Sequence, residues 1–518
     1  QINEGESQTM NYDFSLNFSR QVKELHYLFV FLSYSLDETT YEENIYKAEG
    51  FPSDRMNSIF FARQYAEDTK PQGAESTTRN IGVNAVFNYS YDDRLLFDAT
   101  FRTNASSQFG ANQRWGNFWS LGAGWNMHNE KWLRSKEWFS RLKPRASVGS
   151  TGSQGNNAYQ SLATYNYSEK NYENKLGAYL MGMENKDLKW QKKMDYNVGM
   201  DMSVKNNFNL VFDYYQSTTE NLLVAFTLPP STGFTTVQEN VGKVRNTGIE
   251  LSMSYMVLSR PQDRTFLTLS LRAAHNKNRV VKISDSMKAY NEKMDEMAES
   301  DSKLVTKYYD GVSMNAIWAV RSLGIDPATG REIYLTKDGV STYEYRAEDM
   351  VVCGDNLPKL RGSFGINLGY KGFGLNVMCM YELGAKMYNE TLVDRVENVN
   401  MSYAVDKRVL EGRWQKPGDK VRFRSLKQVW DPEKQAYKVD EKTYATSRFV
   451  QKKNELNISS INFSYDFFRH AFVKKMGMER LSVAFYMNDV AKLSTIKTER
   501  GLSYPFARQF TFSLSASL

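Results

Sequence analysis

Hydrophobic and polar residues alternate with a period of two along much of this chain. The pattern is clearest near the C-terminus, where Phe510, Phe512 and Leu514 alternate with Thr511 and Ser513. Equally regular alternation runs through residues 12–18, 81–91, 194–204, 208–214 and 249–255. Successive side chains of a β-strand point to opposite faces, so these segments predict strands with one apolar and one polar face. We expect about fifteen such strands of roughly nine to fourteen residues, against a mean near six in globular proteins.

The predicted strands are joined by short and long connections that succeed one another along the chain. The short ones fall near residues 19–24, 91–94, 205–207, 259–264 and 370–373, with a slightly longer one at 129–143. The long ones fall near residues 37–77, 103–115, 151–188, 219–243, 280–357 and 389–454. Short periplasmic turns and long extracellular loops are typical of outer-membrane barrels, whereas a soluble sandwich has no reason to sort its loops this way. We therefore predict an all-β fold, a transmembrane antiparallel β-barrel with long extracellular loops.

Some of the long connections have patterns of their own. Ser286 is placed to cap a helix that runs to Glu299, and residues 391–414 show a similar helical spacing of valines and leucines. The helix at Ser286 carries hydrophobic residues near one face, namely Met287, Tyr290, Met294 and Met297. The segment 326–331, followed by Asp338-Gly339, lacks the dense acidic spacing of a calcium loop, so we interpret it as a β-hairpin turn.

Taken without the alternation, the composition of the chain resembles that of a soluble protein. The 518 residues are 41% hydrophobic and 14% aromatic, and the mean hydropathy is -0.57. No apolar run approaches the roughly eighteen residues of a membrane-spanning helix, so a helical membrane protein is excluded. Aromatic residues fall near predicted strand ends, as in the girdles of membrane barrels, with carbohydrate stacking as the alternative interpretation. They are Tyr89, Tyr91, Trp115, Trp119, Trp125 and Trp132.

Charge and candidate chemistry exclude several classes of function. The 66 basic and 59 acidic residues are interleaved, which gives no support for nucleic-acid binding. The four histidines lack metal-ligand spacing, and no motif of nucleophilic, metal-dependent or nucleotide-dependent catalysis occurs. We therefore predict no enzyme activity and no cofactor. Cys353 and Cys379 could pair, but free thiols are the preferred interpretation, and the sequence leaves their redox state open.

Several ordered blocks of sequence resemble a known family. They are RTNASSQFGANQRWGNFWSLGAGW at 102–125, NKDLKWQKKMDYNVGMD at 185–201, YYQSTTENLL at 214–223, LPPSTGFTTVQENVGKVRNTGIEL at 228–251, NLPKLRGSFGINLGYKGF at 356–373 and SYPFARQFTFSLSASL at 503–518. Together these blocks resemble the SusC/RagA branch of TonB-dependent transporters. Their order and spacing hold from about Ser76 to the end of the chain.

This resemblance implies an outer-membrane importer of the Bacteroidetes that takes up oligosaccharides or oligopeptides. The family fold is a barrel of about twenty-two strands closed by an N-terminal plug. The resemblance also implies two partners, a SusD-like surface lipoprotein that acts as a lid and a periplasmic TonB protein that pulls on the plug. A dimer of the transporter–lipoprotein pair is compatible with it. Residues 1–518 are then expected to be the C-terminal part of one barrel in the bacterial outer membrane. The chain opens QINEGESQTM, without an initiator methionine, a basic segment or an apolar leader segment. We therefore expect the first strands, the plug and the TonB-contacting segment to lie outside this chain.

The polar face of the predicted strands supplies the candidate binding residues, because it would line a water-filled lumen. Mixed charge on this face gives no preference for the sign of a cargo. The lumen-facing candidates for plug or substrate contacts are Asp13, Asp98, Arg102, Asp195, Asp201, Asp213, Glu250 and Arg272.

Local motifs add structural predictions and departures from the family pattern. Leu228–Gly233 should fix a loop entry, and Asn246-Thr247-Gly248 should begin a strand where a side chain would crowd its neighbour. The segments 102–110 and 151–156 and the terminal Leu518 differ from the family's usual residues. A passive porin or surface adhesin shares the strand pattern without needing a plug or lid. A soluble β-rich binding protein shares the aromatic content without the sorted loops.

Overall fold

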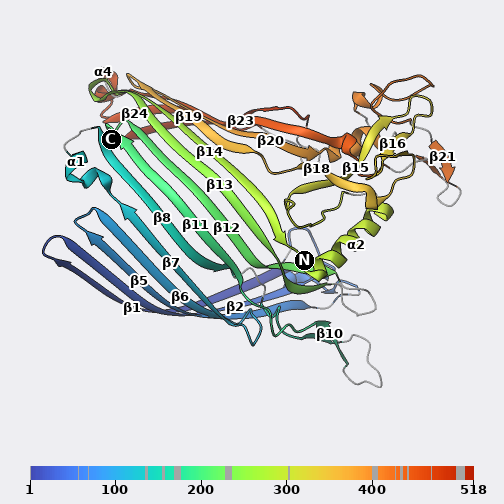
Figure 1. Ribbon diagram of the computed structural model, residues 1–518, viewed down its shortest axis with the longest axis horizontal. Coiled ribbons are helices and arrows are strands. Elements are labelled where there is room, and N and C mark those ends of the chain that lie inside the picture. The colour runs from blue at the N-terminus through green and yellow to red at the C-terminus, as the bar shows by residue number, and fades with distance from the viewer. Residues whose placement is uncertain are drawn as a thin grey trace. The chain divides into compact units, whose positions relative to one another are not determined.

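Fifteen strands pair in chain order into one antiparallel sheet, as predicted (Figure 1). The computed structural model describes residues 2–56, 58–67, 69, 71–134, 138–153, 158–167, 177–227, 236–301, 304–399, 406–425, 428–431, 436–439, 443–467, 470–497 and 508–517. The sheet strands in this part of the chain are β1 (Ile2–Val22), β2 (His26–Tyr46), β5 (Gln72–Tyr91), β6 (Leu95–Ser106), β7 (Trp115–Trp125), β8 (Phe139–Ser153), β11 (Gln191–Val204), β12 (Phe208–Thr227), β13 (Thr236–Arg260), β14 (Thr265–Lys282), β19 (Leu360–Tyr370), β20 (Phe373–Tyr388), β23 (Val450–Asp466), β24 (Arg480–Ser494) and β25 (Phe510–Ser517).

The register keeps hydrophobic and polar residues on separate faces. Phe512 lies opposite Phe485, whereas Ser515 on the alternate phase lies opposite Ser482. Residues directly opposite each other on antiparallel strands point to the same face, so the two phases form an apolar face and a polar face. The same separation recurs at the other end of the chain, where Leu16 lies opposite Leu32. This is the two-faced sheet that the alternation predicts.

Tight turns join the strands that the sequence places close together. Non-glycine residues with positive φ occupy several of them, including Asp92 (φ 50°), Lys205 (φ 47°) and Asn206 (φ 57°). Such values suit two- and three-residue hairpin connections, whose twist matches that of the flanking strands. The predicted positions need two adjustments. Strand β1 runs past the predicted turn start to Val22, and β8 begins at Phe139, inside the predicted connection 129–143.

Several strands are longer than predicted, and the adjoining loops are shorter. Strand β13 has 25 residues, and β2 pairs with β5 as far as Ile45 opposite Gln72. The predicted loop 37–77 is therefore wrong at both ends. Polar residues such as Glu42 and Glu43 lie on both faces there, but ladder hydrogen bonds between backbones require no apolar alternation. Within the described residues, the remaining connection holds β3 (Ala48–Glu49), η1 (Ile59–Phe61) and β4 (Gln64–Tyr65).

Other predicted connections change in the same way. Most of the predicted loop 219–243 is strand, because β12 continues to Thr227 and β13 starts at Thr236. The connection 151–188 contains a hairpin of β9 (Thr164–Tyr167) and β10 (Ala178–Gly182). The predictions on Leu228–Gly233, Gln154–Asn156 and Leu518 lie outside the described residues.

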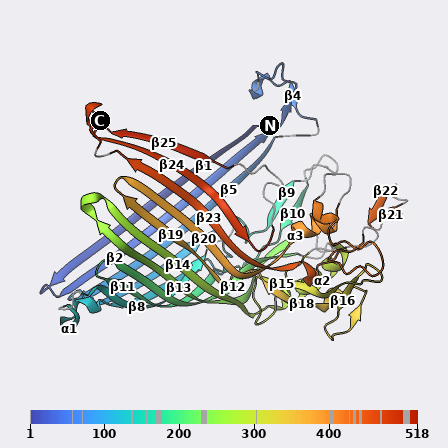
Figure 2. The same cartoon turned by 90° about the horizontal axis from the view of Figure 1, so that it is seen from above.

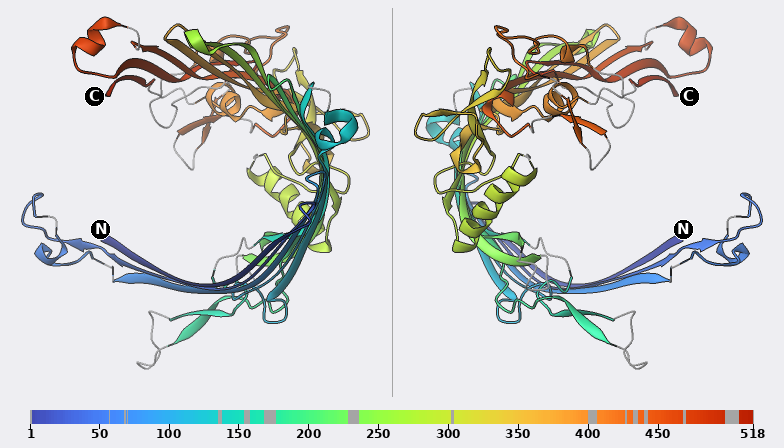
Figure 3. Two further views of the ribbon diagram at one scale, coloured as in Figure 1. Left: turned by 90° about the vertical axis from the view of Figure 1, so that its left-hand side faces the viewer. Right: turned by 90° about the vertical axis from the view of Figure 1, so that its right-hand side faces the viewer.

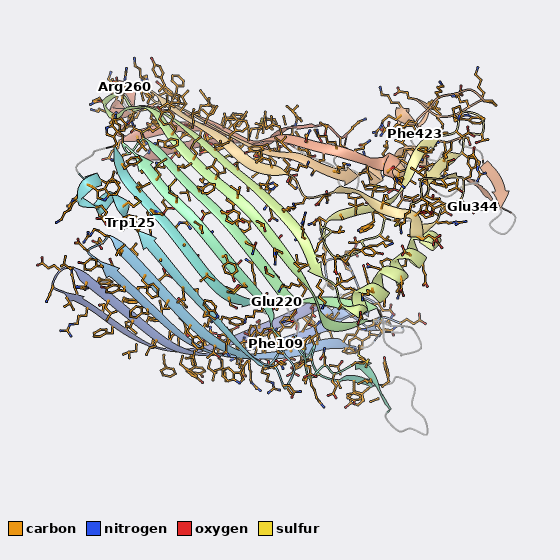
Figure 4. The ribbon with its side chains drawn as sticks, viewed as in Figure 1. Phe109, Trp125, Glu220, Arg260, Glu344 and Phe423 are labelled. Carbon is orange, nitrogen blue, oxygen red and sulfur yellow. The ribbon has the colours of Figure 1, made fainter. Side chains whose placement is uncertain are left out.

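The chain forms two compact units, each described here by itself. Unit 1 comprises Gln1–Asn129, Arg145–Tyr196 and Ser217–Lys243, and unit 2 comprises the remaining segments. Unit 1 has a small aromatic core in which the rings of Phe109 and Trp190 stack with centroids 4.3 Å apart. In Figure 4, Phe109 and Trp125 mark opposite ends of the β6–β7 region.

Tryptophan positions agree only in part with the predicted girdle. Trp115 and Trp125 are the first and last residues of β7, which confirms their place at strand ends. Trp119 lies in the middle of β7, and Trp132 lies on α1 (Lys131–Arg134), in the connection to β8, so the prediction is wrong for these two. Strand β7 has eleven residues, and its tryptophans lie at the first, fifth and last positions, so one of the three is away from the strand ends.

In unit 2, the two longest connections form an ordered loop subdomain, defined here as residues 283–357 and 389–449 as far as they are described. Its elements are α2 (Asp285–Asp301), β15 (Ala316–Ile325), β16 (Glu332–Leu335), β17 (Ser341–Thr342), η5 (Ala347–Asp349), β18 (Met350–Asp355), α3 (Glu390–Leu392), η6 (Val393–Glu397), η7 (Lys407–Val409), β21 (Gln428–Asp431), β22 (Ala436–Val439) and η8 (Ser447–Phe449). It lies at one end of the unit 2 strands (Figures 1 and 2). At the other end, α4 (Ala471–Lys475) lies near the C-terminus (Figure 3).

Strand β15 separates two hydrophobic cores of the loop subdomain. Trp318 and Val320 pack into a cluster with Met294 of α2, whereas Ile317 on the alternate phase packs into a second cluster with Phe449. A strand buried on both faces reads as a continuous apolar run, and the sequence AIWAV at the start of β15 has this form. The long loops are therefore folded structures with cores of their own.

The helix predicted at Ser286 is confirmed, with a different cap. Helix α2 spans Asp285–Asp301, and the Ser284 hydroxyl accepts a hydrogen bond from the Met287 N–H at 3.2 Å. Met287 and Met294 are buried as predicted, but Met297 is 39% exposed and Ala298 takes the buried position. Position 298 continues the 3.6-residue period from 287 and 294 better than 297 does.

The helix predicted over 391–414 is largely wrong. In the described part of this segment, α3 and a single π-helical turn, η6, follow Asn389, and the described residues resume at Asp406, just before η7. The hydrophobic positions are nevertheless buried, because Val396 and Val409 belong to the packed interior of the loop subdomain. Burial was thus predictable from the spacing, whereas the backbone path was set by tertiary contacts.

Candidate functional site on the polar face

The polar face of unit 2 gathers charged side chains from neighbouring strands. Arg272 of β14 lies opposite Ser363 of β19, and Ala274 lies opposite Arg361. Arg361 in turn lies opposite Glu382 of β20. Since opposite residues share a face, Arg272, Arg361 and Glu382 all point to the polar side of the sheet.

A cavity of about 520 Å³ opens on this face. Its charged lining consists of three carboxylates and two guanidinium groups, those of Asp213, Glu250, Glu382, Arg272 and Arg361. Further lining side chains alternate with the same phase on their strands, including Val211, Ser252, Ser363 and Met380. We call this cavity the polar-face pocket. Groups of both signs can bind both ammonium and carboxylate groups of a ligand through charge-assisted hydrogen bonds.

Three sequence-predicted candidates meet in this pocket. Asp213, Glu250 and Arg272 come from the consecutive strands β12, β13 and β14 and line the same cavity. Their assignment required only the phase of each strand and the assumption that consecutive strands pair in order. Their role as ligand contacts is a proposal, which is taken up below.

The other candidates lie elsewhere. Asp201 binds Arg141 of β8 at 2.9 Å, and Asp195 binds Lys193 of its own strand at 2.9 Å. Arg102 donates to the Asn104 side chain at 3.0 Å. None of these lines the polar-face pocket, and neither do Asp13, which lies opposite Ser35, or Asp98, which lies opposite Gly122.

Sequence reasoning missed two charged residues of the pocket. Arg361 occupies the polar phase of β19, next to Gly362, and the phase was readable from Phe364, Ile366 and Leu368. Glu382 was harder to find, because Met378 and Met380 occupy the preceding polar-face positions of β20 and blur the alternation.

A hydrogen-bond network lies along the same face next to the pocket. The side-chain oxygen Oδ1 of Asn246 accepts hydrogen bonds from the side-chain amide groups of Asn276 and Asn278, at 3.2 and 2.9 Å. The Tyr215 hydroxyl donates to Asn276 at 3.3 Å. A Cβ on Gly248 would lie 2.5 Å from the Tyr215 ring, so the predicted crowding at this glycine is confirmed. The prediction that Gly248 lies at a strand start is wrong, because β13 begins at Thr236.

The charged row continues past the pocket onto β23 and β24. The Lys453 ammonium group lies 3.1 Å from Glu382 and 3.3 Å from Glu455, and Lys492 lies 2.9 Å from Glu455. Alternating signs along this row hold each side chain in place, and they leave a surface of mixed charge beside the pocket.

The loop subdomain is held together by a buried ionic network. Arg448 binds Glu332 at 2.8 Å and Glu397 at 2.7 Å, and all three side chains are nearly inaccessible to solvent. Burial alone lowers the pKa of Arg448, but Glu332 and Glu397 outweigh it and hold that pKa above its usual value. Glu332 comes from β16, whereas the other two come from the second long connection, so the network ties the two connections to each other. Figure 4 labels Glu344 and Phe423 in this subdomain, and Arg260 at the opposite end of the strands.

Metal sites and membrane-spanning helices were also sought in the described part of the chain. No group of three or more histidine, cysteine or acidic side chains there is arranged to hold a metal ion. No described helix is long and apolar enough to cross a membrane. Cys353 and Cys379 are both free, with Cys379 buried and Cys353 partly buried, as the preferred interpretation has it.

Comparison with known proteins identifies the family. The family model described as TonB dependent receptor-like, beta-barrel, matches residues 2–404. The chain belongs to this family. It is similar to a TonB-dependent receptor of Formosa agariphila, with 24% identity over 94% of this chain and 50% of that protein. It is also similar to the TonB-dependent receptor SusC of Bacteroides thetaiotaomicron, with 27% identity over 54% of this chain and 29% of that protein.

Solved structures support the fold. A structure of the RagAB peptide importer in its open-open state superposes with a TM-score of 0.81 at 18% identity, over the whole of this chain and 55% of that chain. The predicted resemblance to SusC and RagA and the predicted outer-membrane location are thereby confirmed. The chain spans about half the length of the curated relatives it matches. The family is one of receptors and transporters, which agrees with the predicted absence of enzyme activity.

Proposed function

We propose that this chain forms the barrel wall and long loops of a SusC-like, TonB-dependent importer of oligosaccharides or oligopeptides. A SusD-like lipoprotein would cover the extracellular mouth, and TonB would act through the N-terminal part of the whole protein. A dimer of the transporter–lipoprotein pair belongs to the same proposal. Family membership and the similarity to SusC support it, and so does the likeness in fold to the RagAB peptide importer.

The polar-face pocket is the observation that carries the proposal. An open, non-selective pore requires no recess with converging charges, whereas an importer must hold its cargo before release. The pocket offers Arg272 and Arg361 beside Asp213 and Glu250. Peptides carry both ammonium and carboxylate groups, and neutral oligosaccharides carry neither, so this lining favours oligopeptides as the cargo.

The loop subdomain supplies the proposed docking surface for the lipoprotein. It exposes large apolar side chains, including Leu323 (57% exposed), Val340 (61%) and Leu410 (68%). The buried Arg448 network keeps these segments folded, so the surface is preformed and a partner loses little ordering entropy on binding.

Uptake and co-purification together test the proposal. We expect uptake of labelled oligopeptides by cells to fall to background when TonB is deleted, because plug movement is then not energised. A tagged whole transporter should co-purify with a surface lipoprotein, and mass spectrometry of the released ligand should detect peptides. Uptake that persists without TonB would instead support the alternative of a passive porin, and absence of uptake in both backgrounds would support an adhesin barrel.

A further inference from the structure

A second cavity of unit 2 has a strongly basic lining. Its volume is about 540 Å³, and it is bounded by Lys277, Lys359, Lys386 and Lys452 together with His275 and a single carboxylate, Asp355. We call it the lysine pocket. The function proposed above makes no use of it.

Three lysines of this lining, Lys277, Lys386 and Lys452, lie on the apolar phase of their strands, whereas Asn276 and Asn278 contribute to the lining from the polar phase of β14. On β14 the apolar phase runs through Leu267, Leu269 and Leu271, and the same phase then continues through His275 and Lys277. The polar phase of β14 instead carries Arg272, whose partner Ser363 also lines the polar-face pocket. In a membrane barrel the apolar face contacts lipid, so Lys277 continues a lipid-facing row.

The neighbouring strands repeat this change from apolar to cationic. On β23 the row runs from Phe463 and Ile461 to Leu456 and then reaches Lys452. Lys452 lies directly opposite Lys386 of β20. Lys359 comes immediately before Leu360, the first residue of β19. The apolar rows of β14, β20 and β23 thus end in lysines at the end that carries the loop subdomain, and Lys359 joins them from the residue before β19.

Backbone geometry brings these lysines around one space. A register shift between Glu382 and Ala385 places Gly384 in a bulge with φ +78°. A Cβ on Gly384 would lie 3.1 Å from the Lys359 side chain, so the glycine leaves room for that lysine. His275 Nδ1 lies 2.5 Å from the Lys359 carbonyl oxygen and fixes the chain there.

The charge of the lysine pocket is largely uncompensated. Lys386 donates to the Cys353 carbonyl oxygen at 2.7 Å, which orients the ammonium group without neutralising it. The side chain of Asp355 is used locally, since it accepts the Leu357 N–H at 2.9 Å. Lys277, Lys359 and Lys452 are exposed. Converging cations beside an apolar surface are suited to an anionic headgroup whose acyl chains lie along that surface.

We propose that the lysine pocket binds the phosphate groups of a glycolipid headgroup in the outer leaflet of the outer membrane. This proposal rests on the orientation in the proposed function, which places the loop subdomain outside the cell. Transported cargo is not the ligand, because Lys277, Lys386 and Lys452 lie on the phase of their strands that contacts lipid. Lysine fits this role as a mobile point charge on a long apolar stem.

Native mass spectrometry of the whole transporter in detergent tests the proposal. The probe is bis-phosphorylated lipid A, compared with the same lipid after dephosphorylation. The test variant is K277Q/K359Q/K386Q/K452Q, and the control variant K23Q/K131Q/K205Q/K371Q removes the same charge from connections at the other strand ends. We expect the test variant to bind the phosphorylated lipid at least about tenfold more weakly, with the control variant unchanged.

Three outcomes would overturn the proposal. They are equal binding of the dephosphorylated lipid, an equal loss in the control variant, and displacement of the lipid by an equal concentration of inorganic phosphate. The last outcome would identify a soluble anion as the ligand. If the quadruple variant fails to fold, K277Q and K452Q as single variants should each weaken binding measurably. The assay uses purified transporter without TonB or peptide cargo, so failure of the importer proposal is distinguishable from failure of this one.

Discussion

Gly362 decides how closely two strands approach beside the polar-face pocket. A Cβ at this position would lie 1.9 Å from the Arg272 carbonyl oxygen and 2.7 Å from the Tyr381 hydroxyl. The Tyr381 hydroxyl donates to that same carbonyl at 2.9 Å, so the tyrosine closes over the glycine. A backbone atom cannot rotate away, and any side chain here must separate β14 from β19.

Gly362→Ala is therefore expected to lower the free energy of unfolding by about 1–3 kcal/mol, as overpacked sites typically do. The measurement is denaturant unfolding of the purified protein in detergent. Gly374→Ala is the matched control, because its added Cβ would meet only the Ser464 hydroxyl closely, at 2.5 Å, and that group can rotate. Equal losses in the two variants would contradict the close-approach argument.

The guanidinium groups of the polar-face pocket make a second prediction. Arg272→Gln combined with Arg361→Gln should weaken binding of acidic peptides by at least about tenfold. Hydrogen bonds to charged groups contribute about 1.5–3 kcal/mol each, and 1.4 kcal/mol corresponds to tenfold. Arg141→Gln, which removes a cation bound to Asp201 outside the pocket, should leave binding unchanged. Calorimetric titration of the whole transporter with a synthetic peptide measures both, and comparable weakening by Arg141→Gln would contradict the assignment.

Asp326 gives the loop subdomain a dependence on acid pH. Its carboxylate accepts hydrogen bonds from the Thr329 hydroxyl at 2.6 Å, the Ala328 N–H at 3.0 Å and the Tyr343 hydroxyl at 2.9 Å. These bonds, that of Thr329 foremost, hold the pKa of Asp326 below its usual value. A lowered pKa in the folded state means that the stabilisation is present above the ordinary aspartate pKa of about 3.9 and is lost as pH falls below it.

We therefore expect the hairpin of β15 and β16 to stay closed at pH 5 and to open progressively as the pH falls below about 4. Hydrogen exchange of the hairpin amides across this range, measured by mass spectrometry and corrected for the intrinsic pH dependence of exchange, measures the opening. In Asp326→Asn the hairpin should be weakened at every pH, with no added loss on acidification. An unchanged pH profile in that variant would show that another group is responsible.

At the scale of elements, the buried ionic network of the loop subdomain carries the next prediction. Arg448→Met leaves Glu332 and Glu397 buried with their shared cation removed. Removing one partner of a buried pair typically costs about 3–5 kcal/mol, so the subdomain should open while the strands stay paired. Limited trypsin digestion of the folded protein should then cleave within residues 283–449, with the heat-resistant barrel band retained on gels.

Two further variants give this experiment its controls. Arg346→Met removes an exposed partner of Glu344, and exposed pairs contribute at most about 1 kcal/mol, so its digestion should match the wild type. Adding Glu332→Gln to Arg448→Met should restore part of the protection, because Glu332 is then no longer a buried unpaired charge, and Glu397 still has the Arg424 guanidinium 3.7 Å away. If protection is lost equally in Arg346→Met, the network is not what holds the subdomain.

The elements also show what alternation can and cannot predict. Strands such as β25 follow directly from residues like Phe512 and Leu514, because one face must meet lipid and the other water. The strand over Glu38–Glu42 could not be predicted from alternation, because strands that extend beyond the lipid-facing region pair through their backbones and need no apolar face. The path of residues 393–399 could not be predicted either, because Val396 packs against the distant residues Ile317 and Phe449. Glu250 of the polar-face pocket was predicted, because its strand alternates regularly between hydrophobic and polar residues. Glu382 was missed, because methionines occupy the preceding polar-face positions of its strand.

For the whole molecule, the decisive property is the direction in which the sheet crosses the membrane. Because consecutive strands are antiparallel neighbours, every second connection lies at the same end of the sheet. In unit 2 the tight turns after β13 and β19 lie at one end, and the loop subdomain lies at the other (Figure 1). Both the proposed docking of a lipoprotein and the lysine pocket require the loop subdomain to be outside the cell.

Cysteine labelling tests this direction directly. In a Cys353→Ala, Cys379→Ala background, Asp338→Cys marks the β16–β17 turn and Gln262→Cys marks the β13–β14 turn. A membrane-impermeant maleimide should label Asp338→Cys on intact cells, and should reach Gln262→Cys only after the outer membrane is permeabilised. The reverse pattern would place the loop subdomain in the periplasm, where neither a surface lipoprotein nor outer-leaflet phosphates could reach it. Comparable labelling of the two sites after permeabilisation is the control for accessibility, since both residues are exposed.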